Sequence, residues 1–263
     1  MIIIMLGDVV GESGLLVLEK RLPALINEYR ADFTVVNGEN AAAGFGLTAE
    51  TLDRILSSGA DLVTGGNHIW EKREFWPVLE ASTQKDGKPV LRPANYPGID
   101  GVPGQGWKIL SKNDLSVMAV NLQGRELMTP IDCPFRCFDS IAAEHGNTPI
   151  IVDFHAESSE EKEALAYYLD GRAAIVAGTH THIQTADERL LPKGTAYISD
   201  LGMTGSTAGV IGMDKNICIR RAQSQIVRYM ECTAAKEEDC ALQGIVVELD
   251  ENGRALSIRR INR

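Results

Sequence analysis

The first third of the chain alternates short apolar runs with longer stretches of helical periodicity, and this pattern restricts the folds open to it. Apolar runs occupy residues 1–6, 33–36 and 61–64, and helix-like stretches lie between them at 14–30 and 48–58. Such runs have the length of buried strands and are too short to cross a membrane. The pattern predicts a β-α-β-α-β unit.

The rest of the chain indicates a mixed sheet. Buried-strand patterns at 149–153 and 173–177 flank a helix-like stretch at about 158–170, and another helix is expected at 70–81. Two hairpins are predicted from alternating segments, 107–110 with 115–120 and 243–249 with 255–261. A mixed α/β fold follows, with a β core and helices on its outer faces.

The length favours one domain. A chain of 263 residues is close to the size at which single cores stop growing, about 250–300 residues. The Gly- and Pro-rich stretch 85–106 looks like a loop rather than an interdomain linker. The composition, 44% hydrophobic and 24% charged, is that of an ordinary globular protein. We therefore expect a single domain over 1–263.

Charge and cysteine content narrow the partners and the compartment. The formal net charge of −10 argues against binding to duplex nucleic acid or to an anionic membrane. The five cysteines form an odd set without a close pair, so reduced thiols are expected. The apolar N-terminus has no basic lead and is too short for a signal peptide. These features favour a cytoplasmic protein.

Polar residues that can bind metals stand where the apolar runs end. They are Asp8, Glu39-Asn40, Asn67-His68, His155 and the pair His180 and His182. Each one alone is explained equally well as a cap, a turn or a loop residue bonded to backbone. Because strand ends line the ligand crevice of open α/β sheets, however, these positions can converge. Of the five histidines only His145, at an expected helix end, falls outside them.

The donor types suggest the metal chemistry. Carboxylate, amide and imidazole groups without thiolate suit Mn²⁺, iron or Zn²⁺. The candidates exceed what one tetrahedral site needs, and two cations about 3.5–4 Å apart would use them all. Such a pair would also attract an anionic substrate to an acidic protein.

These residues resemble the calcineurin-like metallophosphoesterases, whose signature is an Asp after the first strand, a second acidic residue, a Gly-Asn-His and a late Gly-His-x-His. More narrowly, the sequence resembles the bacterial YmdB family of phosphodiesterases along nearly its whole length. The segments that carry the resemblance are Asn37-Gly-Glu-Asn40, Gly66-Asn-His-Ile-Trp70, Arg92-Pro-Ala-Asn-Tyr-Pro97, Asp153-Phe-His-Ala-Glu157 and Gly178-Thr-His-Thr-His-Ile-Gln-Thr185. The fold implied is a four-layer αββα metallophosphoesterase sandwich.

The resemblance also implies roles for single residues. One metal would be held by Asp8, Glu39, Asn40 and His182, and the other by Glu39, Asn67, His155 and His180, with Glu39 bridging. Iron or manganese is expected, and zinc is the alternative. The broad signature has Asp-x-His where this chain has Asp8-Val9-Val10, so Asn40 would replace a histidine. His68 would be the general acid, and its alternative role is a loop histidine bonded to backbone.

The implied activity is hydrolysis of 2′,3′- or 3′,5′-cyclic nucleotides by a hydroxide that bridges the two metals. The same metal pair serves phosphomonoesterases and protein phosphatases, which stay open as alternatives, as does a nucleotide-binding regulatory protein of low turnover. Homo-oligomerisation is left open. Trp70, Trp76 and Trp107, with the Pro- and Gly-rich region 93–106, are candidates for a pocket wall or an oligomer contact, and core packing is the expected role of at least two of these tryptophans. The Gly-rich segment 203–213 is expected to be a flap or a surface loop.

Overall fold

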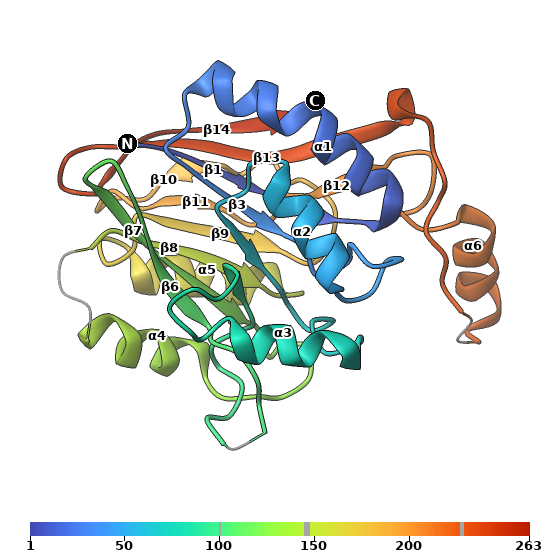
Figure 1. Ribbon diagram of the computed structural model, residues 1–263, viewed down its shortest axis with the longest axis horizontal. Coiled ribbons are helices and arrows are strands. Elements are labelled where there is room, and N and C mark those ends of the chain that lie inside the picture. Colours follow the sequence, from blue (N-terminus) through green and yellow to red (C-terminus); the bar gives the residue numbers. More distant parts are fainter. Residues whose placement is uncertain (100, 145–147, 227–228) are drawn as a thin grey trace.

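The computed structural model describes residues 1–99, 101–144, 148–226 and 229–263, and its strands form two sheets packed face to face (Figure 1). The first sheet has the order β2 (Asp8–Val9), β12 (Met203–Ser206), β13 (Cys240–Leu249), β1 (Ile2–Leu6), β3 (Phe33–Asn37), β4 (Leu62–Thr64) and β5 (Val90–Leu91), with β14 (Ala255–Asn262) paired to β13. The second has the order β10 (Arg189–Leu190), β11 (Ala196–Ile198), β9 (Ile175–Thr179), β8 (Ile150–His155), β7 (Leu115–Gln123) and β6 (Trp107–Lys112).

Helices cover the outer face of each sheet. The helices are α1 (Gly11–Tyr29), α2 (Ala49–Ser57), α3 (Trp76–Ala81), α4 (Pro134–Ala143), α5 (Ser159–Leu169) and α6 (Lys215–Ser224), with short 3₁₀ turns η1 (Arg73–Phe75) and η2 (Glu237–Asp239), and α6, which has no buried residue, lies off the sheets. Figure 1 shows α1 and α2 on one side of the paired sheets and α4 and α5 on the other. A capping box between Thr48 and Thr51 fixes the start of α2.

The alternation of side chains along each strand produces the four layers. In β1, Ile4 and Leu6 join the hydrophobic cluster beneath α1 and α2, whereas Ile3 and Met5 face the space between the sheets. In the second sheet, Ile151 of β8 joins that same central cluster. The opposite face of β8 packs against α4 and α5 in a third cluster. Helix, sheet, sheet and helix therefore stack as the expected αββα sandwich.

Parallel pairing brings the ends of distant strands together. Strands β1, β3, β4 and β5 are parallel neighbours in the first sheet, and β7, β8, β9 and β11 are parallel neighbours in the second. Figure 1 shows both sets running from left to right, toward the same edge of the molecule. The loops that follow β1, β3, β4, β8 and β9 consequently gather at that edge, as predicted.

The segment 203–213 differs from its prediction as a flap or surface loop. Its first four residues form the buried strand β12, in which Thr204–Ser206 pair antiparallel with Cys240–Leu242 of β13. Weak strand propensity in a Gly-rich stretch is overridden here by pairing with a partner far along the chain. The predicted helix over 70–81 is also shorter, since only η1 and α3 are helical.

Other predictions have mixed outcomes. The two hairpins form as β6 with β7 and β13 with β14, and the loop 85–106 contains only the two-residue strand β5 among its described residues. All five cysteines are free.

His145, predicted at a helix end, lies outside the described residues, and the single-domain organisation stays a prediction. Within the described ranges, no helix combines the length and the apolar character that a membrane span requires.

Candidate metal centre

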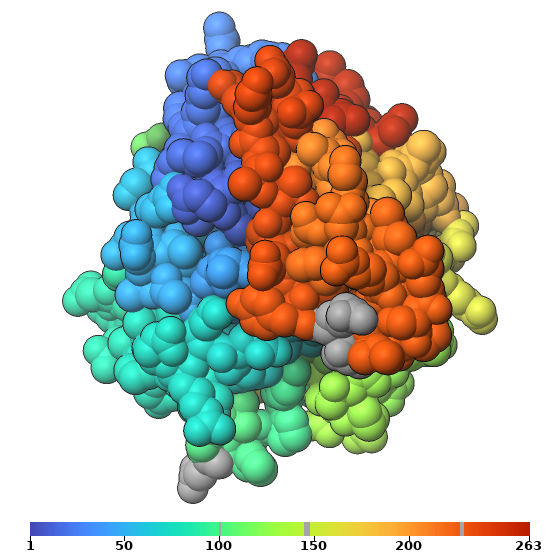
Figure 2. Space-filling model, turned by 90° about the vertical axis from the view of Figure 1, so that its right-hand side faces the viewer, coloured from blue at the N-terminus to red at the C-terminus, as the bar shows by residue number. Residues whose placement is uncertain are grey.

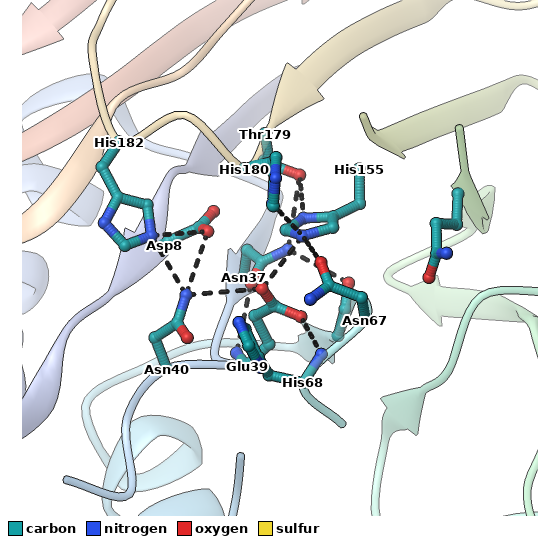
Figure 3. Close-up of polar contacts among 12 residues, drawn as sticks. Asp8, Asn37, Glu39, Asn40, Asn67, His68, His155, Thr179, His180 and His182 are labelled. Carbon is teal, nitrogen blue, oxygen red and sulfur yellow. Dashed lines mark hydrogen bonds and ion pairs between the residues drawn. The ribbon is translucent and has the colours of Figure 1, made fainter. Parts of the chain in front are cut away.

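All the metal-ligand candidates predicted from the sequence lie in one cluster (Figure 3). Asp8 begins β2 just after β1, Glu39 and Asn40 follow β3, and Asn67 follows β4. His155 ends β8 in the other sheet, and His180 and His182 follow β9. The cluster therefore spans both sheets, with the carboxylates and amides supplied by the first and the imidazoles by the second.

One half of the cluster consists of Asp8, Asn40 and His182. Nε2 of His182 lies 3.2 Å from Oδ2 of Asp8 and 3.1 Å from Nδ2 of Asn40. The same amide nitrogen donates to Oδ2 of Asp8 at 3.3 Å and to Oε1 of Glu39 at 3.4 Å. Asn40 thus presents its nitrogen to the cluster, and it would have to turn its amide to act as the predicted ligand.

The other half is built around His155, whose side chain is fully buried. Its Nε2 lies 2.9 Å from Oε1 of Glu39, 3.1 Å from Oδ1 of Asn67 and 3.0 Å from Nδ1 of His180. Glu39 touches both halves through Asn40 and His155. This central position is consistent with the predicted bridging role.

Each of the three imidazoles is oriented by a contact of its outer nitrogen. Nδ1 of His182 donates to the carbonyl oxygen of Ile211 at 2.9 Å, and Nε2 of His180 lies 3.1 Å from the carboxylate of Glu157. Nδ1 of His155 lies 2.9 Å from Oγ1 of Thr179, which itself donates to Asp153 at 2.7 Å and so accepts from the imidazole. Protons on the outer nitrogens leave three lone pairs directed into the cluster, as metal ligands require.

Unsatisfied acceptors show that the residues fit a cation. A single proton on Nε2 of His155 cannot bond Glu39, Asn67 and His180 at once. Oδ1 of Asp8 is completely buried and has no hydrogen-bond partner among the described residues. Atoms of Glu39, His155 and His180 that can bind a metal all lie within 4.8 Å of one another. A largely buried set of acceptors with too few donors is the arrangement a divalent metal satisfies.

The charges of the buried carboxylates and imidazoles act on one another and shift their pKa values against the effect of burial. Burial alone would raise the pKa of Asp8, but the hydrogen bond and charge of His182 outweigh it and lower that pKa. Burial lowers the pKa of His155, yet the charge and hydrogen bond of Glu39, with the charges of Asp8 and Asp153, together outweigh burial and raise it to about 9. Burial and the neighbouring His155 lower the pKa of His180 to about 4. The carboxylates thus favour positive charge beside His155.

His68 lies at the rim, apart from the inward-facing ligands. Its backbone N–H donates to Oε2 of Glu39 at 3.0 Å, which anchors the loop after β4. Its imidazole is 27% exposed, packs edge-on against Phe45 and has Nδ1 3.3 Å from Oε1 of Glu71. A proton on Nδ1 shared with Glu71 leaves Nε2 able to serve an external ligand. The position is compatible with a substrate-facing group.

The loop that carries His180 and His182 is strained and buttressed. Both residues adopt positive φ, at 106° and 64°, which is unfavourable for residues with a side chain. Between them, the N–H and hydroxyl of Thr181 donate to Oδ2 of Asp200 at 3.1 and 2.8 Å. Lys162, which is almost fully buried, forms an ion pair with the same oxygen at 2.9 Å. This pair holds the loop in its strained form.

Sequence reasoning missed the residues behind the ligands. The buried carboxylate of Asp153 accepts from Asn37 at 3.0 Å, from Thr179 and from Thr64. Burial raises its pKa to about 6. The available signal was a polar residue inside an apolar strand, two positions before His155.

Part of the cluster is covered by the segment that follows β12. Figure 2, which looks at the edge where the parallel strands end, shows the orange segment that includes α6 lying across this face beside the teal segment that includes α3. The carbonyl oxygen of Ile211 within that orange segment is the one that orients His182. The covering segment is thus part of the site's construction.

Two mixed sheets packed face to face, with helices stacked outside them, define a fold of the metallophosphoesterase class, and the cluster of carboxylates, amides and imidazoles lies at its joined strand ends. Within that class, the chain belongs to the YmdB-like protein family, whose model matches residues 4–261. The resemblance inferred from the motifs is therefore confirmed.

Relatives and solved structures agree along the whole chain. A Bacillus subtilis (strain 168) protein named 2′,3′-cyclic-nucleotide 2′-phosphodiesterase is 43% identical, over 98% of this chain and 96% of that protein. The crystal structure of a hypothetical protein from Thermus thermophilus has a TM-score of 0.92 and 37% identity, covering 100% of this chain and 99% of that one. That of a phosphatase from Mycoplasma pneumoniae has a TM-score of 0.91 and 30% identity, with 100% and 93% covered.

Proposed function

We propose that this protein is a metal-dependent phosphodiesterase that hydrolyses 2′,3′-cyclic nucleotides, with 3′,5′-cyclic nucleotides as further substrates. The observation that carries the proposal is the set of three imidazoles whose outer nitrogens are paired and whose lone pairs converge on buried carboxylate and amide groups. The name of the Bacillus subtilis relative supplies the substrate class.

The described residues divide between two cation positions that share Glu39. Asp8, Asn40 and His182 would hold one ion with Glu39, and Asn67, His155 and His180 would hold the other. A metal pair supplies Lewis-acid chemistry, which makes a water more acidic and neutralises charge on phosphoryl oxygens. The absence of thiolate from the cluster favours iron or manganese, with zinc as the alternative. Metal analysis of the purified protein tests that assignment.

His68 would act as the general acid. Hydrolysis of a cyclic nucleotide expels a sugar alkoxide, a strong base that needs a proton as the P–O bond breaks. Nε2 of His68 is free of described partners, because the imidazole contacts Glu71 through Nδ1. Partial exposure at the rim lets this nitrogen reach a bound phosphodiester. Glu71 would stabilise the imidazolium form, which carries a proton on Nδ1 and a second one on Nε2 that can be given to the leaving oxygen.

The decisive experiment compares turnover of 2′,3′-cAMP, 3′,5′-cAMP, bis-p-nitrophenyl phosphate and p-nitrophenyl phosphate by the metal-loaded protein. We expect 2′,3′-cAMP and the diester to be hydrolysed faster than the monoester. Glu39→Gln should lose metal and activity together, whereas the exposed Glu80→Gln should behave as wild type. Both glutamates lose the same charge, so the comparison isolates the cluster.

Two outcomes would replace this proposal with another function. Turnover of the monoester alone would identify a phosphomonoesterase or protein phosphatase. Tight binding of 2′,3′-cAMP by the fully metallated protein, without hydrolysis, would identify a regulatory nucleotide-binding protein.

A further inference from the structure

A cavity of about 750 Å³ lies between the segment that follows β5 and one side of α4. The segment is the Arg92-Pro-Ala-Asn-Tyr-Pro97 motif, which the metal cluster does not use, and no ligand candidate of that cluster lines the cavity. Trp107 forms part of the wall, and it also packs against one hydrophobic cluster as Trp70 does against another, which is the core role expected for at least two of the tryptophans. The volume is typical of a small-molecule site.

The cavity contains a buried cation without a counter-charge. Arg92 is only 9% exposed, and Nη1 donates to the carbonyl oxygens of Pro93 and Ala94 at 2.8 and 3.3 Å. Its Nε is buried without a partner, and no carboxylate of the described residues forms an ion pair with it. Burial lowers the pKa of this guanidinium. A buried charge left unpaired is costly, so a bound anion would stabilise it.

Further positive potential surrounds Arg92. Arg136 lines the same cavity on the exposed side of α4 and has no ion pair with another described residue. The N-terminal end of α4, at Pro134, carries neither a side-chain cap nor an acidic residue in its first turn. Asp132 is the only carboxylate among the described residues that line the cavity, and it is exposed. The lining is thus cationic in a protein whose net charge is −10.

We propose that this cavity binds a phosphate ester of mononucleotide size, with the phosphate on Arg92 and Arg136. The guanidinium fork of Arg136 matches two phosphate oxygens, and Arg92, whose Nη1 already donates to two carbonyl oxygens, adds a second positive charge for one dianion. Tyr96 and Trp107 add aromatic surface to the wall, on which a base or another planar group can stack. The site does not depend on the reaction at the metal centre.

Two cysteines in the lining allow occupancy to be measured without interference from the metal centre. Cys133 and Cys137 both face the cavity, whereas Cys218 on α6 does not line it. The experiment follows carbamidomethylation of each cysteine by peptide mass spectrometry on the metal-loaded protein. 5′-AMP, inorganic phosphate and adenosine are added in separate samples. We expect 5′-AMP to slow modification of Cys133 and Cys137 and to leave Cys218 unchanged.

The three probes identify the chemistry. Stronger protection by 5′-AMP than by inorganic phosphate supports a phosphate ester, and equal protection assigns the site to free phosphate, which overturns the ester. Protection by adenosine as strong as that by 5′-AMP overturns the anion site altogether. If 5′-AMP binds the protein, as measured by calorimetric titration, but protects neither cavity cysteine, the ligand binds elsewhere. That result would also overturn the proposed anion site.

Matched arginine variants test the two proposed contacts. Arg136→Gln should raise the 5′-AMP concentration for half-protection about tenfold, because a charge-assisted hydrogen bond is lost. Arg220→Gln on α6 removes another exposed positive charge, outside the cavity, and should change nothing. Arg92→Met should abolish protection, and if that variant fails to fold, Arg136→Gln still decides. Equal half-protection concentrations in Arg136→Gln and Arg220→Gln would overturn the proposal.

Discussion

Glu39 and His68 are close in space and differ in what they can do. Glu39 is fully buried between the two halves of the cluster, and the backbone of His68 donates to its carboxylate. The imidazole of His68 is partly exposed and touches Phe45 and Glu71 instead of the inward-facing ligands. A substitution at His68 can therefore separate proton transfer from metal binding.

We predict that His68→Ala retains metal but lowers turnover of 2′,3′-cAMP by about 10²–10⁴-fold. The loss should be much smaller with bis-p-nitrophenyl phosphate, because p-nitrophenolate leaves without protonation. Steady-state rates on both substrates, together with metal content, check this. An equal loss on the two substrates would show that His68 does not supply the proton.

The sequence predicts which residues form the cluster better than it predicts how their side chains are oriented and bonded. Asp8, Glu39 and the histidines were predictable because each follows an apolar run, and parallel strand ends meet. The orientation of the Asn40 amide was not predictable, since three neighbours from different strands decide it. In the sequence Asp153 is only a polar residue within a buried strand. Its role could not be predicted, because its three hydrogen-bond donors lie on other strands.

At the scale of elements, the end of β9 determines where His180 and His182 lie. Gly178 lets β9 approach the backbone beyond β11 closely, and a Cβ at this position would lie 1.9 Å from the carbonyl oxygen of Ser199. No backbone atom can tolerate that distance, so the strand end would have to move. His180 stands two residues farther along and would move with it.

We predict that Gly178→Ala weakens metal binding by at least about tenfold and lowers stability by roughly 1–3 kcal/mol through overpacking. Metal titration and denaturant unfolding measure the two effects. Gly98→Ala is the matched control, because a Cβ there meets nothing within 4 Å. Wild-type metal affinity in Gly178→Ala would mean that the loop absorbs the shift without displacing its histidines.

The Lys162–Asp200 pair fixes the same loop from behind. Lys162→Met should destabilise the protein by about 3–5 kcal/mol, because the Asp200 carboxylate stays buried without its cation. The double variant Lys162→Met/Asp200→Asn should be less destabilised than Lys162→Met alone, since no unpaired charge remains. Denaturant unfolding of both variants checks this. If the double variant is the less stable, the pair acts mainly through the hydrogen bonds of Asp200 to Thr181.

Elements with strong local patterns were predictable, and those made by distant pairing were not. β1, β3, β4, β8 and β9 carry continuous apolar runs, and a turn sequence marks the C-terminal hairpin. β12 has the sequence Met-Thr-Gly-Ser and becomes a strand only because β13 and β2 pair with it. The cap at Asp214 starts α6, whose described side chains include none that is buried and so give no amphipathic signal.

On the scale of the whole molecule, the cluster joins the two sheets. Asp8, Glu39 and Asn67 belong to strand ends of the first sheet, and His155 and His180 to those of the second. Away from this edge, the contact between the sheets is a central apolar cluster that includes Ile3, Met5, Val117 and Ile175. The acceptors at the edge repel one another unless a positive charge lies among them. Bound metal should therefore contribute to the stability of the complete sandwich.

Metal removal should lower the melting temperature through this linkage. Ligand at about 100 times its Kd contributes roughly 2.7 kcal/mol to the folded state, which corresponds to a shift of roughly 5–10 °C in a protein of this size. Calorimetry of the metal-loaded protein, with and without a chelator, measures the shift. Glu39→Gln has little metal to lose, so its melting temperature should not respond to the chelator, whereas Glu80→Gln should respond as wild type does. An unchanged melting temperature of the wild-type protein after complete demetallation would show that the apolar cluster alone holds the sheets together and that the metals serve only chemistry.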